Sequence, residues 1–185
     1  GRADLVAAVS LAGVRRSRPI IEVLGDAEAD MVVRACAAGR VSARNAAITL
    51  LAVTTGLRAC DIIALRLADV DRRGQAIGIV QRKTGNPLTL PLPALVMGKL
   101  AGYVLGERPA TADDHVFVRV VAPHVRLADH ASVHQVISAT FAAAGAADAK
   151  AGTRFLRHST ATRLLRAAVP LPTIFCFANN AITGP

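Results

Sequence analysis

Residues 54–71 read TTGLRACDIIALRLADVD, and this stretch constrains the fold more than any other. Gly56 interrupts a preceding run that is apolar almost all round, so we expect a buried helix to end there. Ser42 is a suitable N-cap for that helix, and another helix is expected from Ala59 to about Leu67. Arg58 therefore lies at a turn between two helices, where the backbone is held rigidly and the side chain can face outward.

The segments on either side predict further helices and one small sheet. Two alternating apolar runs, Ile77–Ile79 and Leu88–Leu92, are separated by QRKTGNP, which indicates a β-hairpin. Start and stop signals predict helices over residues 26–39, 93–106, 130–145 and 156–168, and residues 114–121 read as a short extended piece. The expected fold class is α+β and mainly helical, with one small antiparallel sheet or hairpin.

Two of these helices carry more specific predictions. Asp26 is expected to be the N-cap of the first one. In the last one, Ala161, Leu164, Leu165 and Ala168 recur at the spacing of one helix face, which predicts that they form its core stripe.

Composition and charge limit the classes of partner. With 185 residues, of which 52% are apolar, the chain can form one domain with a sizeable core. Aromatic residues make up 3% and Trp is absent, which disfavours a stacking platform for single-stranded bases. Twenty-two Lys and Arg against thirteen Asp and Glu give a net charge of +9, which favours a polyanion such as duplex DNA. On charge alone, a basic protein without a nucleic-acid partner is equally consistent.

Other features of the sequence suggest an intracellular protein. Cys36, Cys60 and Cys176 are odd in number and widely spaced, so neither a disulfide framework nor a CxxC metal site is indicated. No stretch is long and apolar enough to predict a transmembrane helix, and we expect a cytoplasmic location. Residues 1–18 run into the basic stretch RRSRP at residues 15–19 and are expected to be a linker or the tail of an upstream domain, with one domain over residues 19–185.

A second stretch, GTRFLRHSTATRLL at residues 152–165, completes a recognisable pair. Together with the pattern TGLRxxDxxxLxxxDVD at residues 55–71, it resembles the two arginine motifs of the tyrosine recombinases, or phage integrases. That family cuts and rejoins DNA through a phosphotyrosine bond. The resemblance implies a recombinase-type catalytic domain in which Arg58 and Arg157 hold one DNA phosphate, with Asp61 orienting Arg58. Arginine suits this task because its planar fork donates two charge-assisted hydrogen bonds to one phosphate.

The resemblance also assigns three further site residues. Lys83, in the turn of the predicted hairpin, matches a mobile lysine that protonates the leaving oxygen. Arg154 stands where the family most often has His, and it keeps the positive charge but cannot act as a base. Asn180 stands at another His position, where it can donate a hydrogen bond but cannot shuttle a proton. Taken singly, the four basic residues also read as ordinary solvated surface residues: Arg58, Lys83, Arg154 and Arg157.

The nucleophile is the main departure from the family pattern. The one tyrosine is Tyr103, upstream of the second arginine motif, and it reads as a packing residue on a helix. We therefore expect residues 19–185 to form one catalytic domain, incomplete at its C-terminus, that binds duplex DNA, alongside other recombinase protomers, but does not cleave it. A non-catalytic DNA-binding regulator of recombination sites is the first alternative. An unrelated helical module whose arginines face acidic protein surfaces is the second.

Other candidate sites are weaker. His130 and His134 have the spacing of metal ligands on a helix, but neither a Glu after His130 nor a third ligand supports a zinc site. No glycine-rich phosphate loop is present in the sequence, so we expect no nucleotide cofactor, no other small-molecule cofactor and no metal.

Overall fold

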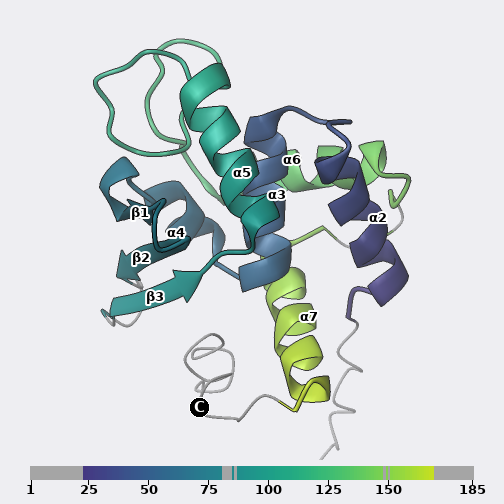
Figure 1. Cartoon of the computed structure of the whole chain (residues 1–185). Coiled ribbons are helices and arrows are strands. Elements are labelled where there is room, and N and C mark those ends of the chain that lie inside the picture. The colour runs from purple at the N-terminus through teal and green to yellow at the C-terminus, as the bar shows by residue number, and fades with distance from the viewer. Residues whose placement is uncertain (1–22, 81–84, 86, 148, 150, 169–185) are drawn as a thin grey trace, which may run out of the picture.

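The computed structural model describes residues 23–80, 85, 87–147, 149 and 151–168. Figure 1 shows helices gathered around a central one, with a small sheet on one side. The helices are α2 (Asp26–Ala37), α3 (Ala43–Thr55), α4 (Ala59–Ala64), α5 (Ala94–Gly102), α6 (His130–Ala143) and α7 (Thr153–Arg166), with a 3-10 turn η1 (Leu67–Asp69) and a π-helical turn η2 (Tyr103–Glu107). The strands are β1 (Val70–Asp71), β2 (Ala76–Val80) and β3 (Pro87–Pro91). The predicted fold class, α+β and mainly helical, is confirmed.

Helix α3 is the central element, and its ends are closely fixed. It packs against α2, α4, α5, α6 and α7. At its start, Ser42 is the N-cap as predicted, and its hydroxyl accepts a hydrogen bond from the Asn45 N–H at 3.2 Å. The Glu107 carboxylate accepts the N–H groups of Ala43 and Arg44, so an acidic group from a distant part of the chain offsets the positive end of the helix dipole. At its other end Gly56 adopts the left-handed conformation with φ of 63°, as expected for a C-terminal glycine.

The predicted hairpin is confirmed, and it belongs to a sheet of order β1-β2-β3. Strands β2 and β3 are antiparallel, and Ile77 pairs with Leu90. Both side chains are buried, because alternate residues of each strand face the core. Strand β1 was not predicted. Most of the hairpin turn, including Lys83, lies outside the described residues.

Two predicted helix boundaries are wrong. Asp26 is not the N-cap: Gly25 holds that position, and its N–H donates to the Glu28 carboxylate at 3.0 Å. The helix predicted from Ala59 to about Leu67 ends at Ala64. Its backbone groups turn outward there, because the Val116 N–H donates to Leu65 O and the Leu67 N–H donates to Asp114 O. A loop distant in sequence thus supplies the hydrogen-bond partners that a further helical turn would have supplied.

The segments after the sheet agree with the predicted ranges in part. The helix predicted over residues 93–106 is α5, which passes directly into the π-helical turn that ends at Glu107. The extended piece at residues 114–121 is reduced to two isolated bridges, from His115 to Arg66 and from Val118 to Arg126. Helix α6 matches the range predicted for it to within two residues.

Helix α7 exposes the residues that were predicted to be its core. Leu165 is 50% exposed, Ala168 is exposed, and Ala161 and Leu164 are only half-buried. Its buried residues are Leu156, Ser159 and Thr160. The predicted stripe is wrong because this helix packs against the C-terminal end of α3, where free carbonyl groups require hydrogen-bond donors.

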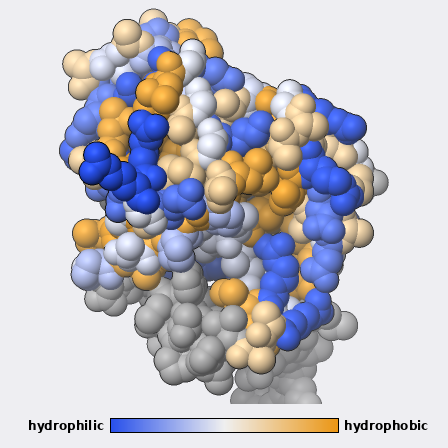
Figure 2. All heavy atoms as spheres, viewed as in Figure 1, coloured by the Kyte–Doolittle hydropathy of each residue, from blue (hydrophilic) through white to orange (hydrophobic). Residues whose placement is uncertain are grey.

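The surface and the cysteines complete the description. Figure 2 shows hydrophilic and apolar residues intermixed over the visible face. No helix in the described ranges is long and apolar enough to cross a membrane. Cys36 is buried and Cys60 half-buried, both as free thiols, and burial raises the pKa of Cys36 to about 11. The linker expected at residues 1–18, and Cys176, lie outside the described residues.

Candidate active site

The two arginine motifs meet where α7 packs on the C-terminal end of α3 (Figure 1). The Arg157 Nε–H donates to Gly56 O at 2.8 Å, across 101 residues of sequence. The Thr160 hydroxyl lies 3.0 Å from Val53 O, at the same end of α3. The turn that leads into Arg58 is therefore directly tied to the helix that carries Arg157.

Gly56 makes this close approach possible. A Cβ atom at this position would lie 3.3 Å from the Arg157 Cα and 3.4 Å from the Thr160 Cβ. Its φ of 63° also lies in the left-handed region, which is unfavourable for residues that carry a Cβ atom. Both requirements select glycine, so Gly56 serves as a helix end and as the contact point of the two motifs.

Arg58 is placed by the start of α4. Its backbone is extended, with φ of −72° and ψ of 151°, and it is the N-cap residue of that helix. Its carbonyl accepts the N–H groups of Asp61 and Ile62, both at 3.0 Å. The residue is only half-buried, so part of it remains open to solvent.

Electrostatics show that Arg157 and Arg58 lie close enough to interact. Burial first, and then the positive charge of Arg58, lower the pKa of Arg157 to about 10, against the opposing effects of Asp61 and Cys60. Burying one cation beside another is unfavourable unless an anion neutralises them. The site is therefore suited to a negatively charged ligand.

The first turns of α7 add to this positive field. Helix α7 begins at Thr153, so Arg154 and Arg157 are three residues apart on one helix. No acidic residue stands in its first turn, where the positive end of the helix dipole would normally attract one. Burial first, and then the charges of Arg154 and Arg157, lower the pKa of His158, which favours its neutral imidazole.

Asp61 and Cys60 lie beside the two arginines. Asp61 is buried, its charge acts on Arg157, and its Oδ1 lies 3.7 Å from the Cys60 Sγ. The predicted bridge from Asp61 to Arg58 stays a prediction. Burial, aided by Asp61, raises the pKa of the Cys60 thiol, and the two arginines oppose that rise. Sequence reasoning missed this thiol because nothing in the local pattern distinguishes it from a packing residue.

The remaining candidate residues are not all placed. Lys83 and Asn180 lie outside the described residues, so their roles stay predictions. Arg163 was not among the predicted site residues, and it donates to Val53 O at 2.5 Å. The available signal was its position three residues after Thr160 and six after Arg157, which keeps all three residues within about one third of the helix circumference.

Tyr103 is a packing residue, as predicted. Its side chain is 1% exposed, and its ring stacks on Phe117 with 5.6 Å between ring centroids. Its hydroxyl accepts a hydrogen bond from the Val118 N–H at 3.3 Å. A phenol enclosed in this way cannot reach a DNA phosphate.

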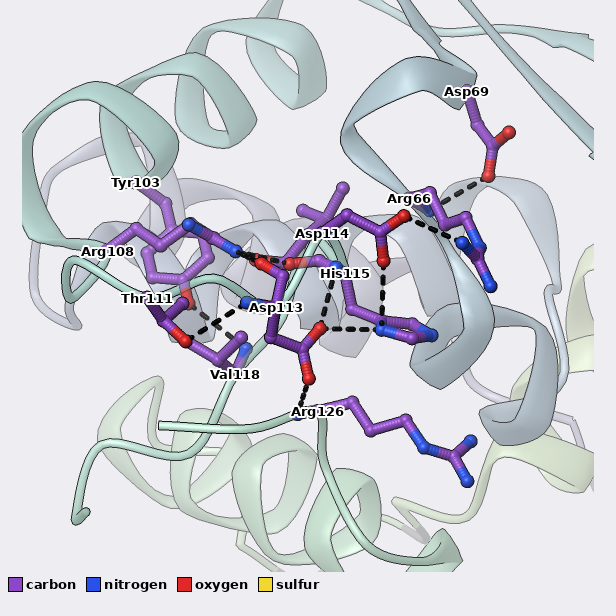
Figure 3. A network of polar contacts seen from close by, with 11 residues as sticks. Arg66, Asp69, Tyr103, Arg108, Thr111, Asp113, Asp114, His115, Val118 and Arg126 are labelled. Carbon is purple, nitrogen blue, oxygen red and sulfur yellow. Dashed lines mark hydrogen bonds and ion pairs between the residues drawn. The ribbon is translucent and has the colours of Figure 1, made fainter. Parts of the chain in front are cut away.

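A polar network elsewhere brings together the described residues that are best suited to hold a metal ion (Figure 3). These are Asp113, Asp114 and His115, and the His115 Nδ1 lies 2.7 Å from Asp113 Oδ1. The Asp113 carboxylate also accepts the backbone N–H groups of His115 and Arg126. These hydrogen bonds, that of the His115 backbone first, lower the pKa of Asp113 to about 2. Backbone donors already occupy this carboxylate, so the network reads as a clasp for its loop.

Comparison with known proteins identifies the family. The model of the phage integrase family matches residues 22–178. The protein y4gC of Sinorhizobium fredii, named as an integrase/recombinase, is 36% identical over 128 residues, which cover 69% of this chain and 65% of that protein. The crystal structure of XerA recombinase is 25% identical, with a TM-score of 0.73 over 86% of this chain and 56% of XerA.

A DNA complex has the same fold. XerH recombinase, solved in a post-cleavage complex with a palindromic difH substrate, is 21% identical with a TM-score of 0.74, over 93% of this chain and 50% of XerH. The match thus spans between half and two thirds of these three proteins. Since the family model covers most of its length, the chain belongs to the phage integrase family.

Proposed function

We propose that this chain binds duplex DNA and holds one backbone phosphate between Arg58 and Arg157. The observation that carries the proposal is the pairing of two like charges, one of them largely buried, on elements that contact each other through Gly56 and Arg157. A structure that brings two guanidinium groups together in this way is favourable when an anion shares them. A phosphodiester supplies that anion in a geometry that guanidinium forks match.

Each arginine has a defined part in this grip. The Arg157 Nε–H donates to Gly56 O, which fixes the plane of the guanidinium. We assign the terminal N–H groups to two oxygens of the phosphate. Arg58 approaches the same phosphate from the turn before α4. Two fixed cations would also stabilise the charge that develops during phosphoryl transfer, without a metal ion.

Three observations support DNA as the ligand. The chain carries a net charge of +9, which favours association with a polyanion. XerH recombinase and lambda integrase, which share the fold, were solved bound to DNA. The N-terminal turns of α7 add Arg154 to the same positive region. Within this proposal Lys83 stands at the general-acid position, which has no leaving oxygen to protonate while the DNA is uncut, and Asn180 contributes a hydrogen bond to the phosphate.

We further propose that the 185 residues bind DNA without forming a covalent bond to it. Their one tyrosine is Tyr103, which is buried against Phe117. Arg154 supplies charge where the family most often has a histidine, and it cannot accept a proton. The same observations favour the second candidate function, a DNA-binding regulator that occupies recombination sites without cutting them.

Binding to a short duplex across a salt series tests the phosphate grip. Each phosphate that is neutralised contributes about 0.9 to the slope of log affinity against log salt. Arg157→Ala should weaken binding by about 1–3 kcal/mol and reduce this slope by about one phosphate. Arg34→Ala, which removes an exposed charge from the last turn of α2, is the matched control. Equal behaviour of the two variants would contradict the proposal.

A nicked suicide substrate tests the second part. Such a substrate traps any covalent intermediate, because the cut strand diffuses away before it can be rejoined. We expect no covalent adduct by denaturing electrophoresis. An adduct on any residue would show that the chain carries a nucleophile that its buried tyrosine does not supply.

A further inference from the structure

The C-terminal end of α3 receives hydrogen bonds from within α3 and from α7. The Thr54 and Thr55 hydroxyls donate to the carbonyls of Leu50 and Leu51, and the Gly56 N–H donates to Ala52 O. These bonds arise within α3 and its cap. Two further acceptors, Val53 O and Gly56 O, take donors from α7.

Val53 O is the more heavily bonded of these two. The Arg163 Nη2 lies 2.5 Å from it, and the Thr160 hydroxyl lies 3.0 Å from it. Arg163 also lies 3.4 Å from that hydroxyl, so the three groups form one cluster. A cation at the C-terminal end of a helix is favourable because the helix dipole is negative there. Arg163 is therefore held by both charge and hydrogen bonding.

The donors on α7 are regularly spaced. Arg157, Thr160 and Arg163 follow one another at intervals of three residues, so they lie along one side of the helix. Arg157 bonds the Gly56 end of the contact, and Arg163 bonds the Val53 end. One such bond would leave α7 free to pivot about it. Two bonds a turn and a half apart fix both the tilt and the rotation of the helix.

We propose that Arg163 is a positioning residue, which holds α7 on the end of α3 so that the Arg157 guanidinium faces Arg58. This inference rests on the proposed phosphate grip. The Arg163 guanidinium donates to Val53 O and does not itself bind the phosphate. Its effect on the phosphate comes from the orientation that it gives to Arg157.

The direct test is the exchange rate of the Arg157 Nε–H with solvent, measured by NMR on the full chain without DNA. The substitution is Arg163→Met, and the matched control is Arg166→Met, which removes an exposed arginine from the same last turn of α7. We expect Arg163→Met to speed this exchange about tenfold or more, since the hydrogen bond to Gly56 O loosens. Arg163→Lys keeps a cationic donor and should restore slow exchange.

Unchanged exchange in a folded Arg163→Met variant would overturn the inference. If that variant does not fold, Arg163→Gln replaces it, because a shorter neutral amide weakens the contact while keeping a donor. Exchange as slow as in the parent chain would overturn the inference there too. If Arg163 only stabilised the fold, its substitution would lower the unfolding temperature and leave the exchange rate of the Arg157 Nε–H unchanged.

Binding to a short duplex separates this inference from the proposed function. Arg163→Met should reduce the salt slope by about as much as Arg157→Ala does, roughly one phosphate, and the double variant should lose little more. If Arg157→Ala itself leaves the slope unchanged, the phosphate grip fails. If Arg157→Ala lowers the slope and Arg163→Met does not, the grip stands and the positioning role fails.

Discussion

Replacing Gly56 by alanine should damage both the fold and the arginine site, whereas replacing Gly39 should damage the fold alone. Both glycines have positive φ, 63° and 72°, so alanine is strained at either position. They differ in their surroundings. A Cβ atom at Gly56 would lie 3.3 Å from the Arg157 Cα, and one at Gly39 would have nothing within 4 Å. Gly39→Ala is therefore a matched control for backbone strain.

The expected magnitudes follow from this difference. Alanine in the left-handed region costs about 1 kcal/mol, which is the whole effect expected at Gly39. At Gly56 the added atom also presses on the backbone of Arg157 and on the β-branched Thr160, neither of which can rotate away. Overpacking of this kind costs about 1–3 kcal/mol. We expect Gly56→Ala to lose about 2–4 kcal/mol in the free energy of unfolding.

Denaturant unfolding and duplex binding measure the two consequences. Gly56→Ala should also weaken duplex binding by about tenfold, because α7 must move away from the turn that leads to Arg58. Gly39→Ala should bind like the parent chain. Equal losses of stability in the two variants, together with unchanged binding by Gly56→Ala, would refute the close contact on which the site depends.

Three further predictions concern the clasp, the tyrosine and the anion site. The pKa of Asp113 is lowered from 3.8 to about 2 in the fold, so its carboxylate stabilises the protein above about pH 4 and loses that effect as the pH falls toward 2. Allowing for solvent screening, Asp113→Asn should cost about 1 kcal/mol at neutral pH, and unfolding measured across a pH series should show the difference vanish near pH 2. Tyr103→Phe leaves the buried Val118 N–H without its partner, so thermal unfolding should show a loss of about 1 kcal/mol while duplex binding stays unchanged. Inorganic phosphate should raise the unfolding temperature of the parent chain and have a smaller effect on Arg157→Ala, and an equal shift in both would place the anion elsewhere.

Much of the central architecture could be predicted from local sequence signals. Ser42 and Gly56 cap α3 at the expected positions, and the alternating runs give the β2 and β3 pairing. These features are local, since a capping residue or an alternating run acts on its nearest neighbours. The motif resemblance singled out Arg58 and Arg157, and in the fold the charge of Arg58 acts on Arg157, but their shared grip on a phosphate and their catalytic roles stay predictions.

The errors arose where distant segments supply hydrogen-bond partners. The helix that was expected to reach Leu67 ends early because loop residues after Asp113 take its backbone groups. The buried face of α7 was misplaced because apolar spacing was taken as the guide to burial. Thr160 and Arg163 lie against α3 because its last carbonyls need donors, and no apolar pattern records that requirement.

A double-mutant cycle on duplex binding tests the shared phosphate most directly. Affinities are measured for the parent chain, Arg58→Ala, Arg157→Ala and the double variant at one low salt concentration. If both arginines hold one phosphate, each single substitution weakens binding and the double variant loses clearly less than the sum of the two losses. Losses that add fully, or two single variants that bind like the parent chain, would contradict a shared phosphate.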